Sequence, residues 1–312
     1  MARKITVAAA QMGPIQRADD RASVVARLLE LMREAHAMGC RFVVFPELTL
    51  TTFFPRWIMM DQAEIDAYFE AEMPGPETHV LFETAAELGI GFHLGYAELA
   101  RENGALRHFN TAILVDERGR IVGKYRKVHL PGHAEPDNTR YAQHLEKRYF
   151  DVGDLGFPVW RAFGGVMGMC ICNDRRWPET FRVMGLQGVE LVALGYNTPN
   201  TNTQTYEPHH LRMFHNHLVM QAGAYQNATY VVAAAKAGVE DGHGLIGGSC
   251  IIAPWGEIVA QAQTEDDELV AARIDLDLCT FGKETVFNFA AHRRIEHYGL
   301  ICERTGAEPP PK

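Results

Sequence analysis

The chain has 312 residues with 47% hydrophobic and 22% charged content, so it can bury a sizeable core as one large α/β domain or as two ordinary domains. Its formal net charge of -9 argues against nucleic acid or an anionic membrane as a partner, because both require a concentrated basic surface. No apolar stretch approaches the ~20 residues that span a bilayer, and the N-terminal segment has no secretory cleavage pattern, so we expect a cytoplasmic protein that acts on a small soluble molecule.

Short apolar runs alternate with amphipathic stretches along the chain, which predicts strands and helices in turn. A helix is expected over 21–38, because Val24, Leu28 and Leu31 recur at helical spacing and Asp20 can cap its start. Strands are predicted near residues 5–12, 40–46, 89–97, 110–116, 120–126, 166–172, 189–195, 229–235, 249–254, 257–263 and 269–274.

Two further helices are expected in the second half of the chain. One begins at Pro178, since proline is well placed in the first turn of a helix. A longer helix follows Pro208, and its histidine-rich HHLRMFHNH segment is explained by packing rather than by a metal site. Its apolar positions recur as a stripe of Leu211, Phe214, Leu218, Ala222 and Tyr225.

Two β-hairpins are predicted from the segments AILV-DERG-RIVGKY and CIIA-PWGE-IVAQAQ, which turn on glycine-containing polar residues. So many strands are too many for one open sheet, whereas two packed sheets flanked by helices would accommodate them. Because no low-complexity linker interrupts the sequence, we expect residues 1–312 to form a single domain, with a mobile proline-rich tail from about residue 303.

One cysteine lies at a position suited to chemistry. Cys172, in GVMGMCICNDRRWPET, stands where an apolar strand stops and a polar turn toward a helix begins. α/β folds expose reactive groups at such strand ends, and a helix N-terminus nearby would favour the thiolate. A buried structural thiol is the competing interpretation, and it is the one expected for Cys170. A Cys-x-Cys metal site lacks further ligands, so no metal is predicted.

Two other apolar strands end in ionisable groups. In CRFVVFPELTL, a proline that cannot extend the sheet places Glu47 at a strand end, where a carboxylate can act as a general base. In GKYRKVHLPG, alternation puts Tyr125 and Lys127 on one face and Lys124 and Arg126 on the other. A lysine beside a thiol can stabilise charge that develops on a carbonyl oxygen. Taken alone, Glu47 is explained as a solvated carboxylate at a strand end, and the run from Lys124 to Lys127 as a solvated basic strand.

Glu, Lys and Cys, each at the end of its own strand and in this chain order, resemble the catalytic triad of the nitrilase superfamily. The resemblance runs from AAAQMGP through FPEL, GKYRKVHLPG and CNDRRWPE to SCIIAPWGEIVA. It implies an α/β fold, a four-layer αββα sandwich, with Glu47, Lys127 and Cys172 as catalytic residues and no cofactor. It also implies that Glu146 is a second carboxylate that holds Lys127 and Glu47 in place.

Longer motifs resemble the D-carbamoylase family within this superfamily: FPRW, HLEKRYF-x-x-GDLGFPV, CNDRRWPET, GYNTP and HYGL. This resemblance implies hydrolysis of N-carbamoyl-D-amino acids to the D-amino acid, ammonia and carbon dioxide through a covalent Cys172 intermediate. Arg175 and Arg176 are expected to grip the substrate carboxylate, because guanidinium offers planar bidentate donors. Segments 200–208 and 239–248 resemble the family less closely. The full set of expected substrate-binding residues is Asn173, Arg175, Arg176, Asn197, Thr198, His129 and His144.

Several other functions stay open from the sequence. Another nitrilase-superfamily amidase, a β-ureidopropionase or a nitrilase would keep the triad without requiring Arg175 and Arg176. A catalytically silent binding or assembly protein, or a metallohydrolase, belongs to a different class. The resemblance also implies a homodimer or homotetramer whose C-terminal segment contacts a neighbouring subunit.

Overall fold

Two six-stranded β-sheets packed face to face form the centre of the molecule, which the computed structural model describes for residues 2–140, 142–201 and 207–311. The first sheet has the order β14 (Glu268–Asp275), β1 (Lys4–Gln11), β2 (Phe42–Val44), β3 (Gly91–Glu102), β4 (Ala105–Val115), β5 (Ile121–Arg126). The second has the order β13 (Ile258–Gln261), β12 (Cys250–Ile252), β9 (Tyr230–Ala235), β8 (Leu191–Tyr196), β7 (Gly165–Ile171), β6 (Val159–Ala162).

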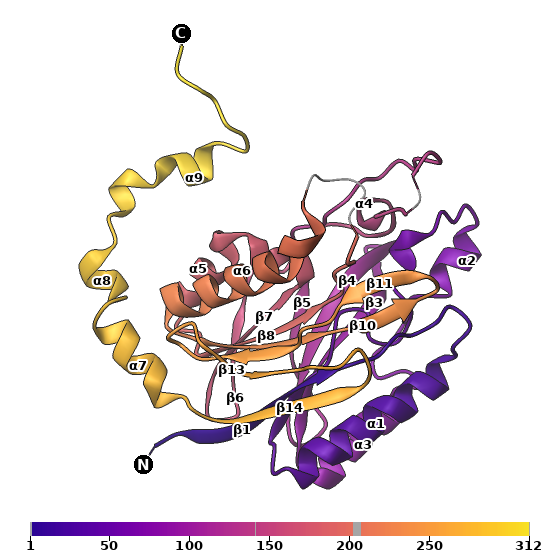
Figure 1. Cartoon of the computed structure of the whole chain (residues 1–312), viewed down its shortest axis with the longest axis horizontal. Coiled ribbons are helices and arrows are strands. Elements are labelled where there is room, and N and C mark those ends of the chain that lie inside the picture. The colour runs from indigo at the N-terminus through magenta and orange to yellow at the C-terminus, as the bar shows by residue number, and fades with distance from the viewer. Residues whose placement is uncertain (1, 141, 202–206, 312) are drawn as a thin grey trace.

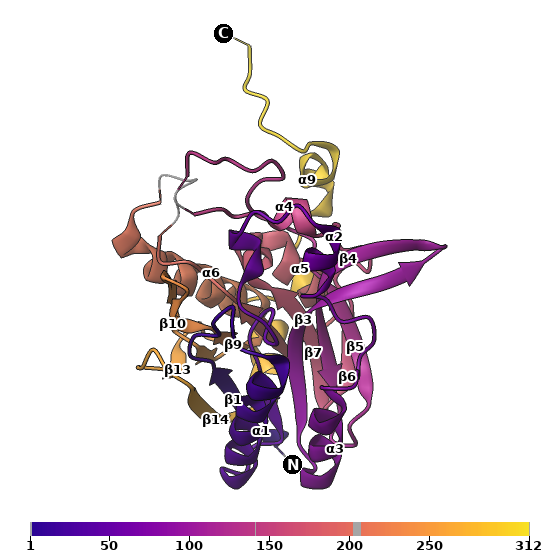
Figure 2. The same cartoon turned by 90° about the vertical axis from the view of Figure 1, so that its right-hand side faces the viewer.

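Helices cover the outer face of each sheet. The helices α1 (Arg21–Ala37) and α3 (His79–Leu88) pack on the first sheet, and α5 (Pro178–Leu186) and α6 (Arg212–Asn227) pack on the second (Figures 1 and 2). The layers therefore follow the order αββα, which confirms the fold class predicted from the sequence. Parallel pairs β1–β2, β2–β3, β7–β8 and β8–β9 lie at the centre of the two sheets, and antiparallel strands flank them.

Local sequence signals account for where the helices begin. The side chain of Asp20 accepts a hydrogen bond of 2.8 Å from the backbone N–H of Ser23, which caps α1 as predicted. Pro178 occupies the first turn of α5. The remaining short helices are α2 (Gln62–Asp66), α4 (Glu146–Tyr149), α7 (Asp277–Glu284), α8 (Phe289–His292) and α9 (Gly299–Glu303).

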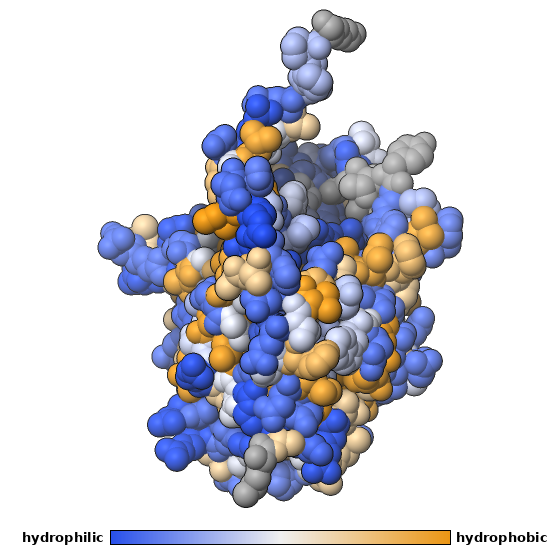
Figure 3. Space-filling view, turned by 90° about the vertical axis from the view of Figure 1, so that its left-hand side faces the viewer, coloured by the Kyte–Doolittle hydropathy of each residue, from blue (hydrophilic) through white to orange (hydrophobic). Residues whose placement is uncertain are grey.

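The C-terminal segment extends beyond the sandwich. From α7 through α9 it curves along one side of the molecule and ends away from both sheets (Figure 1). Figure 3 views this side, where apolar and polar residues alternate along the surface. Seven large apolar side chains of this segment are exposed: Leu278, Phe281, Val286, Ile295, Tyr298, Leu300 and Ile301.

The strand predictions are confirmed, and both predicted hairpins form, as β4–β5 and β12–β13. Three strands were not predicted: the edge strand β6 and the small separate hairpin of β10 (Ala237–Glu240) and β11 (His243–Ile246). Each of these contains only four residues, which is too short for alternation to be distinguished from a loop.

The helix α6 is confirmed, but its apolar stripe does not face the protein, so packing does not explain Phe214. Phe214 and Leu218 are 58% and 47% exposed. The side chains that face the protein are instead those of Arg212, Asn216 and Met220. Polar groups on the inner face find partners in the second sheet and its loops, so the apolar residues of this helix remain outside.

All six cysteines are free, and five of them are buried.

Across the described residues, no helix is both long enough and apolar enough to cross a membrane.

Two glycines on facing strands allow the sheets to approach the Pro46–Glu47 backbone closely. A Cβ on Gly95 of β3 would lie 2.6 Å from the carbonyl oxygen of Pro46. A Cβ on Gly195 of β8 would lie 2.5 Å from the backbone nitrogen of Glu47. Both neighbours are backbone atoms, which cannot rotate away, so neither position accommodates a side chain without movement of the segment that carries Glu47.

We therefore predict that Gly195→Ala destabilises the protein by about 1–3 kcal/mol, the usual cost of overpacking a filled interior. Urea unfolding of the variant and of Gly306→Ala measures this, because a Cβ at Gly306 meets no atom within 4 Å. Equal midpoints for Gly195→Ala and the natural protein would contradict the close approach.

Candidate active site

A lysine buried between two carboxylates forms the centre of the site. Lys127 Nζ lies 2.7 Å from Glu47 Oε1 and 2.5 Å from Glu146 Oε2, and all three side chains have no exposed surface. Burial alone would lower the pKa of Lys127, but Glu146 and Glu47 outweigh it and hold that pKa above its usual value. Lys127 is therefore a fixed positive charge. Burial opposes ionisation of Glu146, yet Lys127 and His144 hold the pKa of Glu146 below its usual value.

Glu47 is fixed by two asparagines, Asn110 of β4 and Asn197, which directly follows β8. Asn110 Nδ2 donates to Glu47 Oε1 at 2.8 Å, and the backbone N–H of Asn197 donates to Glu47 Oε2 at 2.9 Å. Asn197 Nδ2 also donates to the backbone oxygen of Glu47 at 2.8 Å. The carboxylate of Glu47 therefore has little freedom to rotate. The sequence analysis missed Asn110, for which the available signal was a lone amide at the start of the apolar run NTAILV in β4.

Cys172 stands immediately after β7, as predicted, and begins a 3₁₀ turn that extends to Arg176. Its φ of +48° is a left-handed conformation that is costly for a residue with a Cβ, and such residues cluster at functional sites. Burial and the nearby Glu47 raise the pKa of Cys172 to about 11, although Lys127 and Arg175 oppose this. The expectation that the resting sulfur favours the thiolate is therefore wrong, because burial outweighs the short turn.

Asp174 is a buried hub beneath the nucleophile turn. It accepts hydrogen bonds from the Tyr125 hydroxyl at 2.7 Å and from the Ile171 backbone N–H at 3.1 Å. His129 approaches the same carboxylate with both its backbone N–H and Nδ1, at 2.9 and 2.8 Å. The imidazole of His129 is also stacked on Trp177. His129 thus contacts the nucleophile turn through Asp174. It was predicted to bind substrate, but it is absent from the described lining of the pocket beside Cys172.

Arg175 is held by the protein itself. Its Nη1 donates to the carbonyl oxygen of Cys172 at 2.5 Å, and its Nη2 donates to Thr198 Oγ1 at 2.8 Å. Nε and Nη2 both donate to Asn216 Oδ1, and the guanidinium lies over the Tyr196 ring at 4.6 Å. With donors on all three nitrogens engaged, Arg175 ties α6 to the nucleophile turn.

A pocket opens beside Cys172, and it brings together most of the predicted substrate-binding residues. It also contains Glu207 and Arg212, which the sequence analysis missed. Arg176 remains partly exposed, and its Nη1 lies 3.5 Å from Glu207 Oε1. The predicted residues among the lining are His144, Cys172, Asn173, Arg175, Arg176, Asn197 and Thr198.

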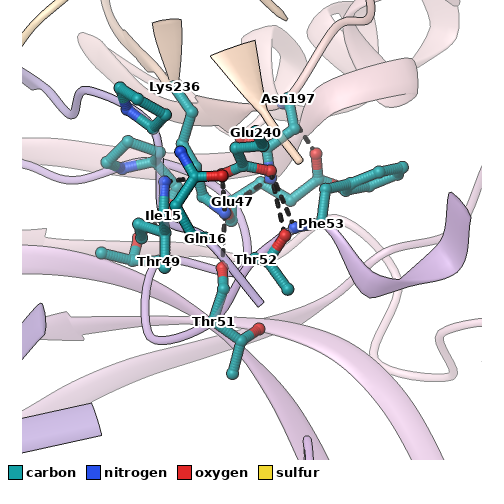
Figure 4. A network of polar contacts seen from close by, with 12 residues as sticks. Ile15, Gln16, Glu47, Thr49, Thr51, Thr52, Phe53, Asn197, Lys236 and Glu240 are labelled. Carbon is teal, nitrogen blue, oxygen red and sulfur yellow. Dashed lines mark hydrogen bonds and ion pairs between the residues drawn. The ribbon is translucent and has the colours of Figure 1, made fainter. Parts of the chain in front are cut away.

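A second buried ionic network fixes the loop that follows Glu47 (Figure 4). Glu240 accepts hydrogen bonds from the backbone N–H of Phe53 at 3.0 Å and from Arg56 Nη2 at 2.8 Å. Lys236 Nζ contacts Glu240 Oε1 at 3.1 Å and donates to the carbonyl oxygen of Thr51 at 2.5 Å. The loop after Glu47 is therefore held by the buried charges of Lys236 and Glu240, which follow β9 of the second sheet.

The comparisons with known proteins identify the family. A model of the family described as carbon-nitrogen hydrolase matches residues 6–284. An N-carbamoylputrescine amidase of Arabidopsis thaliana is 31% identical over 303 residues, which cover 92% of this chain and 93% of that protein.

Solved structures share the fold. A carbon-nitrogen hydrolase from Helicobacter pylori superimposes with a TM-score of 0.81 at 22% identity, over 97% of this chain and 99% of that one. An amidase from Nesterenkonia, solved with an acetamide moiety added covalently at its active-site cysteine, has a TM-score of 0.70 at 19% identity, over 94% of each chain. The chain belongs to the carbon-nitrogen hydrolase family, the nitrilase superfamily. It is a hydrolase of carbon–nitrogen bonds with amidase activity.

The raised pKa of Cys172 predicts how its reactivity depends on pH. Because the thiolate is the nucleophile toward iodoacetamide and the pKa is about 11, the alkylation rate should rise about tenfold per pH unit between pH 7 and 9.5 without levelling. Mass spectrometry of the Cys172 peptide in a Cys302→Ser background measures this rate, since Cys302 is the exposed thiol. A plateau below pH 9 would show that the resting thiolate is favoured after all.

Proposed function

We propose that the protein hydrolyses N-carbamoyl-D-amino acids to the D-amino acid, ammonia and carbon dioxide. The observation that carries the proposal is the combination of a buried Glu47–Lys127–Glu146 cluster with a guanidinium-rich pocket at Cys172. The buried cluster, together with Cys172, suits attack on an amide-type carbonyl. The arginine-rich pocket suits a substrate that carries a carboxylate. The preference for the D-isomer rests on the motifs shared with the D-carbamoylase family.

The proposed mechanism begins with transfer of the Cys172 thiol proton to Glu47 as the sulfur attacks the ureido carbon. Lys127 then stabilises the oxyanion of the tetrahedral intermediate. Collapse expels an amine as the proton returns from Glu47, and a covalent acyl-type intermediate remains on Cys172. Glu47 next takes a proton from water as the water oxygen attacks the acyl carbon; the carbon–sulfur bond then breaks, and the proton returns from Glu47 to the sulfur. The carbamic acid that is released decomposes to carbon dioxide and the second nitrogen-containing product, so that both ammonia and the amino acid are formed. One water is consumed overall, and no cofactor is needed.

The carboxyl group of Glu146 has a positioning role in this mechanism. Its Oε2 contacts Lys127, and its Oε1 lies 3.1 Å from His144 Nε2. Both oxygens of the buried carboxylate are therefore engaged, so Glu146 keeps Lys127 charged and aimed. His144 completes this support and lines the pocket as well.

The polar atoms of the pocket also fit a ureido substrate. Asn197 Oδ1 is buried without a hydrogen-bond partner among the described residues, while its Nδ2 is committed to Glu47. An acceptor in this position suits an N–H of the carbamoyl group. The side chain of Asn173 lines the same pocket and donates to the carbonyl oxygen of His129 at 3.0 Å.

Charge distinguishes this substrate class from that named for the Arabidopsis relative. N-carbamoylputrescine ends in a primary amine that is protonated at neutral pH. The pocket holds three guanidinium groups, from Arg175, Arg176 and Arg212, against the single carboxylate of Glu207 among the described lining residues. This excess of positive charge favours an anionic ligand over a cationic one.

A substrate panel tests the proposed function. We predict rapid ammonia release from N-carbamoyl-D-phenylalanine, and release slower by at least about tenfold from N-carbamoylputrescine, which corresponds to about 1.4 kcal/mol. The L-isomer, a simple amide and a nitrile complete the panel. Cys172→Ser should keep the fold and lose activity by about 1,000-fold or more. Ammonia release from the nitrile alone, or normal turnover by Cys172→Ser, would contradict the proposed function.

We further propose that the protein works as a homodimer or homotetramer in the cytoplasm. Buried free thiols are typical of a reducing compartment. Exposed apolar side chains on α5 and α6, among them Leu186, Phe214 and Leu218, form a surface suited to a second copy of the chain.

Sedimentation velocity tests the assembly. A species larger than the 34.9 kDa chain is expected at micromolar concentration, and the paired change Phe214→Glu and Leu218→Glu should shift it toward the monomer. Monomeric sedimentation of the natural protein would contradict the proposal. Val259→Glu, at an exposed position of β13, is the control.

A further inference from the structure

Asn110 of β4 is a buried amide whose carbonyl oxygen has no hydrogen-bond partner among the described residues. The residue is 1% exposed, and its Nδ2 donates to Glu47 Oε1 at 2.8 Å. An unpaired acceptor in the interior is costly, and an apolar residue at this position of the NTAILV run would avoid the cost. The amide cannot flip, because its oxygen would then face the Glu47 carboxylate. The donor that Asn110 presents to Glu47 therefore calls for a functional explanation.

Asn110 and Lys127 present their donors to the same carboxylate oxygen. The two residues lie opposite each other at the ends of neighbouring strands, since the backbone N–H of Lys127 donates to the carbonyl oxygen of Asn110 at 2.8 Å. Lys127 Nζ lies 2.7 Å from Glu47 Oε1. Each oxygen of a carboxylate has two lone-pair sites. The two donors occupy both sites on Oε1, so a proton could bind Oε1 only by displacing one of them.

The other oxygen of Glu47, Oε2, has a lone-pair site left. Among the described residues, its only donor is the backbone N–H of Asn197, at 2.9 Å. The carbonyl oxygen of the same Asn197 accepts a hydrogen bond of 3.7 Å from the Cys172 thiol. Asn197 and Cys172 directly follow β8 and β7 of the second sheet, whereas both donors to Oε1 come from the first sheet. The open site of Glu47 is thus on the oxygen held from the sheet that carries the nucleophile.

We propose that Asn110 is a positioning residue that, together with Lys127, closes Oε1 to protons, so that Oε2 alone carries the proton through the reaction. In the first half, the Cys172 thiol proton moves to Oε2 as the carbon–sulfur bond forms, and it passes to the leaving nitrogen as the carbon–nitrogen bond breaks. In the second half, Oε2 takes a proton from water as the carbon–oxygen bond forms, and it returns that proton to the sulfur as the carbon–sulfur bond breaks. The inference rests on Glu47 as the proton acceptor of the proposed mechanism and on no particular substrate.

Asn110→Leu tests the proposal, because it removes the donor and the unpaired oxygen in one change of similar size. The variant opens a second protonation site on Oε1, which is directed away from Cys172. We expect kcat to fall by about 100-fold, in the range of general acid–base effects, while KM changes by less than about threefold. Both constants are measured from ammonia release, with the substrate of the panel that the natural protein hydrolyses fastest.

Asn110→Asp separates the donor from the bulk of the side chain. The new carboxyl has the same shape, and it donates to Oε1 only while it is protonated. Two carboxyl groups in contact share a proton, and the charged or titratable groups around this pair are Lys127, Glu146 and Cys172. The kcat of Asn110→Asp relative to the natural protein should therefore fall by about tenfold or more from pH 6 to pH 9, as the shared proton is lost. The same ratio for Asn110→Leu should not fall over this range.

Asn227→Leu, at the end of α6, is the matched control. Asn227 is also buried, and its Oδ1 is likewise unpaired among the described residues, but its Nδ2 donates to the carbonyl oxygen of Gly223 instead of a carboxylate. This variant should keep the kcat of the natural protein.

Three results would overturn the role of Asn110: an unchanged kcat in Asn110→Leu, a loss that appears in KM alone, or a loss in Asn110→Asp that is independent of pH. Any of them would leave the amide as a packing element only. Failure of the proposed function gives a different result. The natural protein would then release no ammonia from N-carbamoyl-D-phenylalanine, and another substrate of the panel would serve for the same comparison.

Discussion

The chemistry of this site depends on the burial of the Lys127 ammonium between two carboxylates. Removing a charge from water costs several kcal/mol, and the cost is recovered only where partners are close and well aligned. Here Glu47 and Glu146 supply the opposite charges, while Asn110, Asn197 and His144 occupy further carboxylate lone pairs. The three ionised groups carry one net negative charge. Ionising Cys172 beside them would add a second, which explains why burial and Glu47 raise the pKa of Cys172 to about 11.

This charge balance constrains the first step of the reaction. Loss of the thiol proton to bulk water would increase the buried negative charge, whereas transfer of that proton to Glu47 leaves the total unchanged. The surroundings therefore favour a thiolate that forms only as the proton moves to Glu47 and the sulfur attacks. Two hydrogen bonds between Asn197 and Glu47 hold Glu47 in place across the two sheets. The glycines at 95 and 195 allow the Glu47 backbone to lie this close to both sheets.

Hydrophobic periodicity was sufficient to predict the strands that end near Glu47, Lys127 and Cys172. The four-layer sandwich and the catalytic role of these residues were predicted from the resemblance to the nitrilase superfamily, because each strand end taken alone also has an ordinary structural explanation. The sequence did not reveal Arg212, for a physical reason. Periodicity assumes that the inner face of a helix is apolar, but α6 places Arg212 and Asn216 inside and Phe214 outside. The pocket wall, rather than the core, determines that face. Asn110 was missed because one amide in an apolar strand does not disturb the pattern.

Charged residues also take buried positions near the loop that follows Glu47, where Glu240 and Lys236 are fully buried. Together with Arg56 they fix the backbone after Glu47 through charged hydrogen bonds instead of apolar packing. Stability is supplied elsewhere, by the apolar clusters between the sheets and beneath α1 and α3. Because interactions far apart contribute nearly independently, the charges of the pocket wall can vary while these clusters preserve the fold. A chain built in this way can change the residues of its pocket wall without altering Lys127 and its two carboxylates.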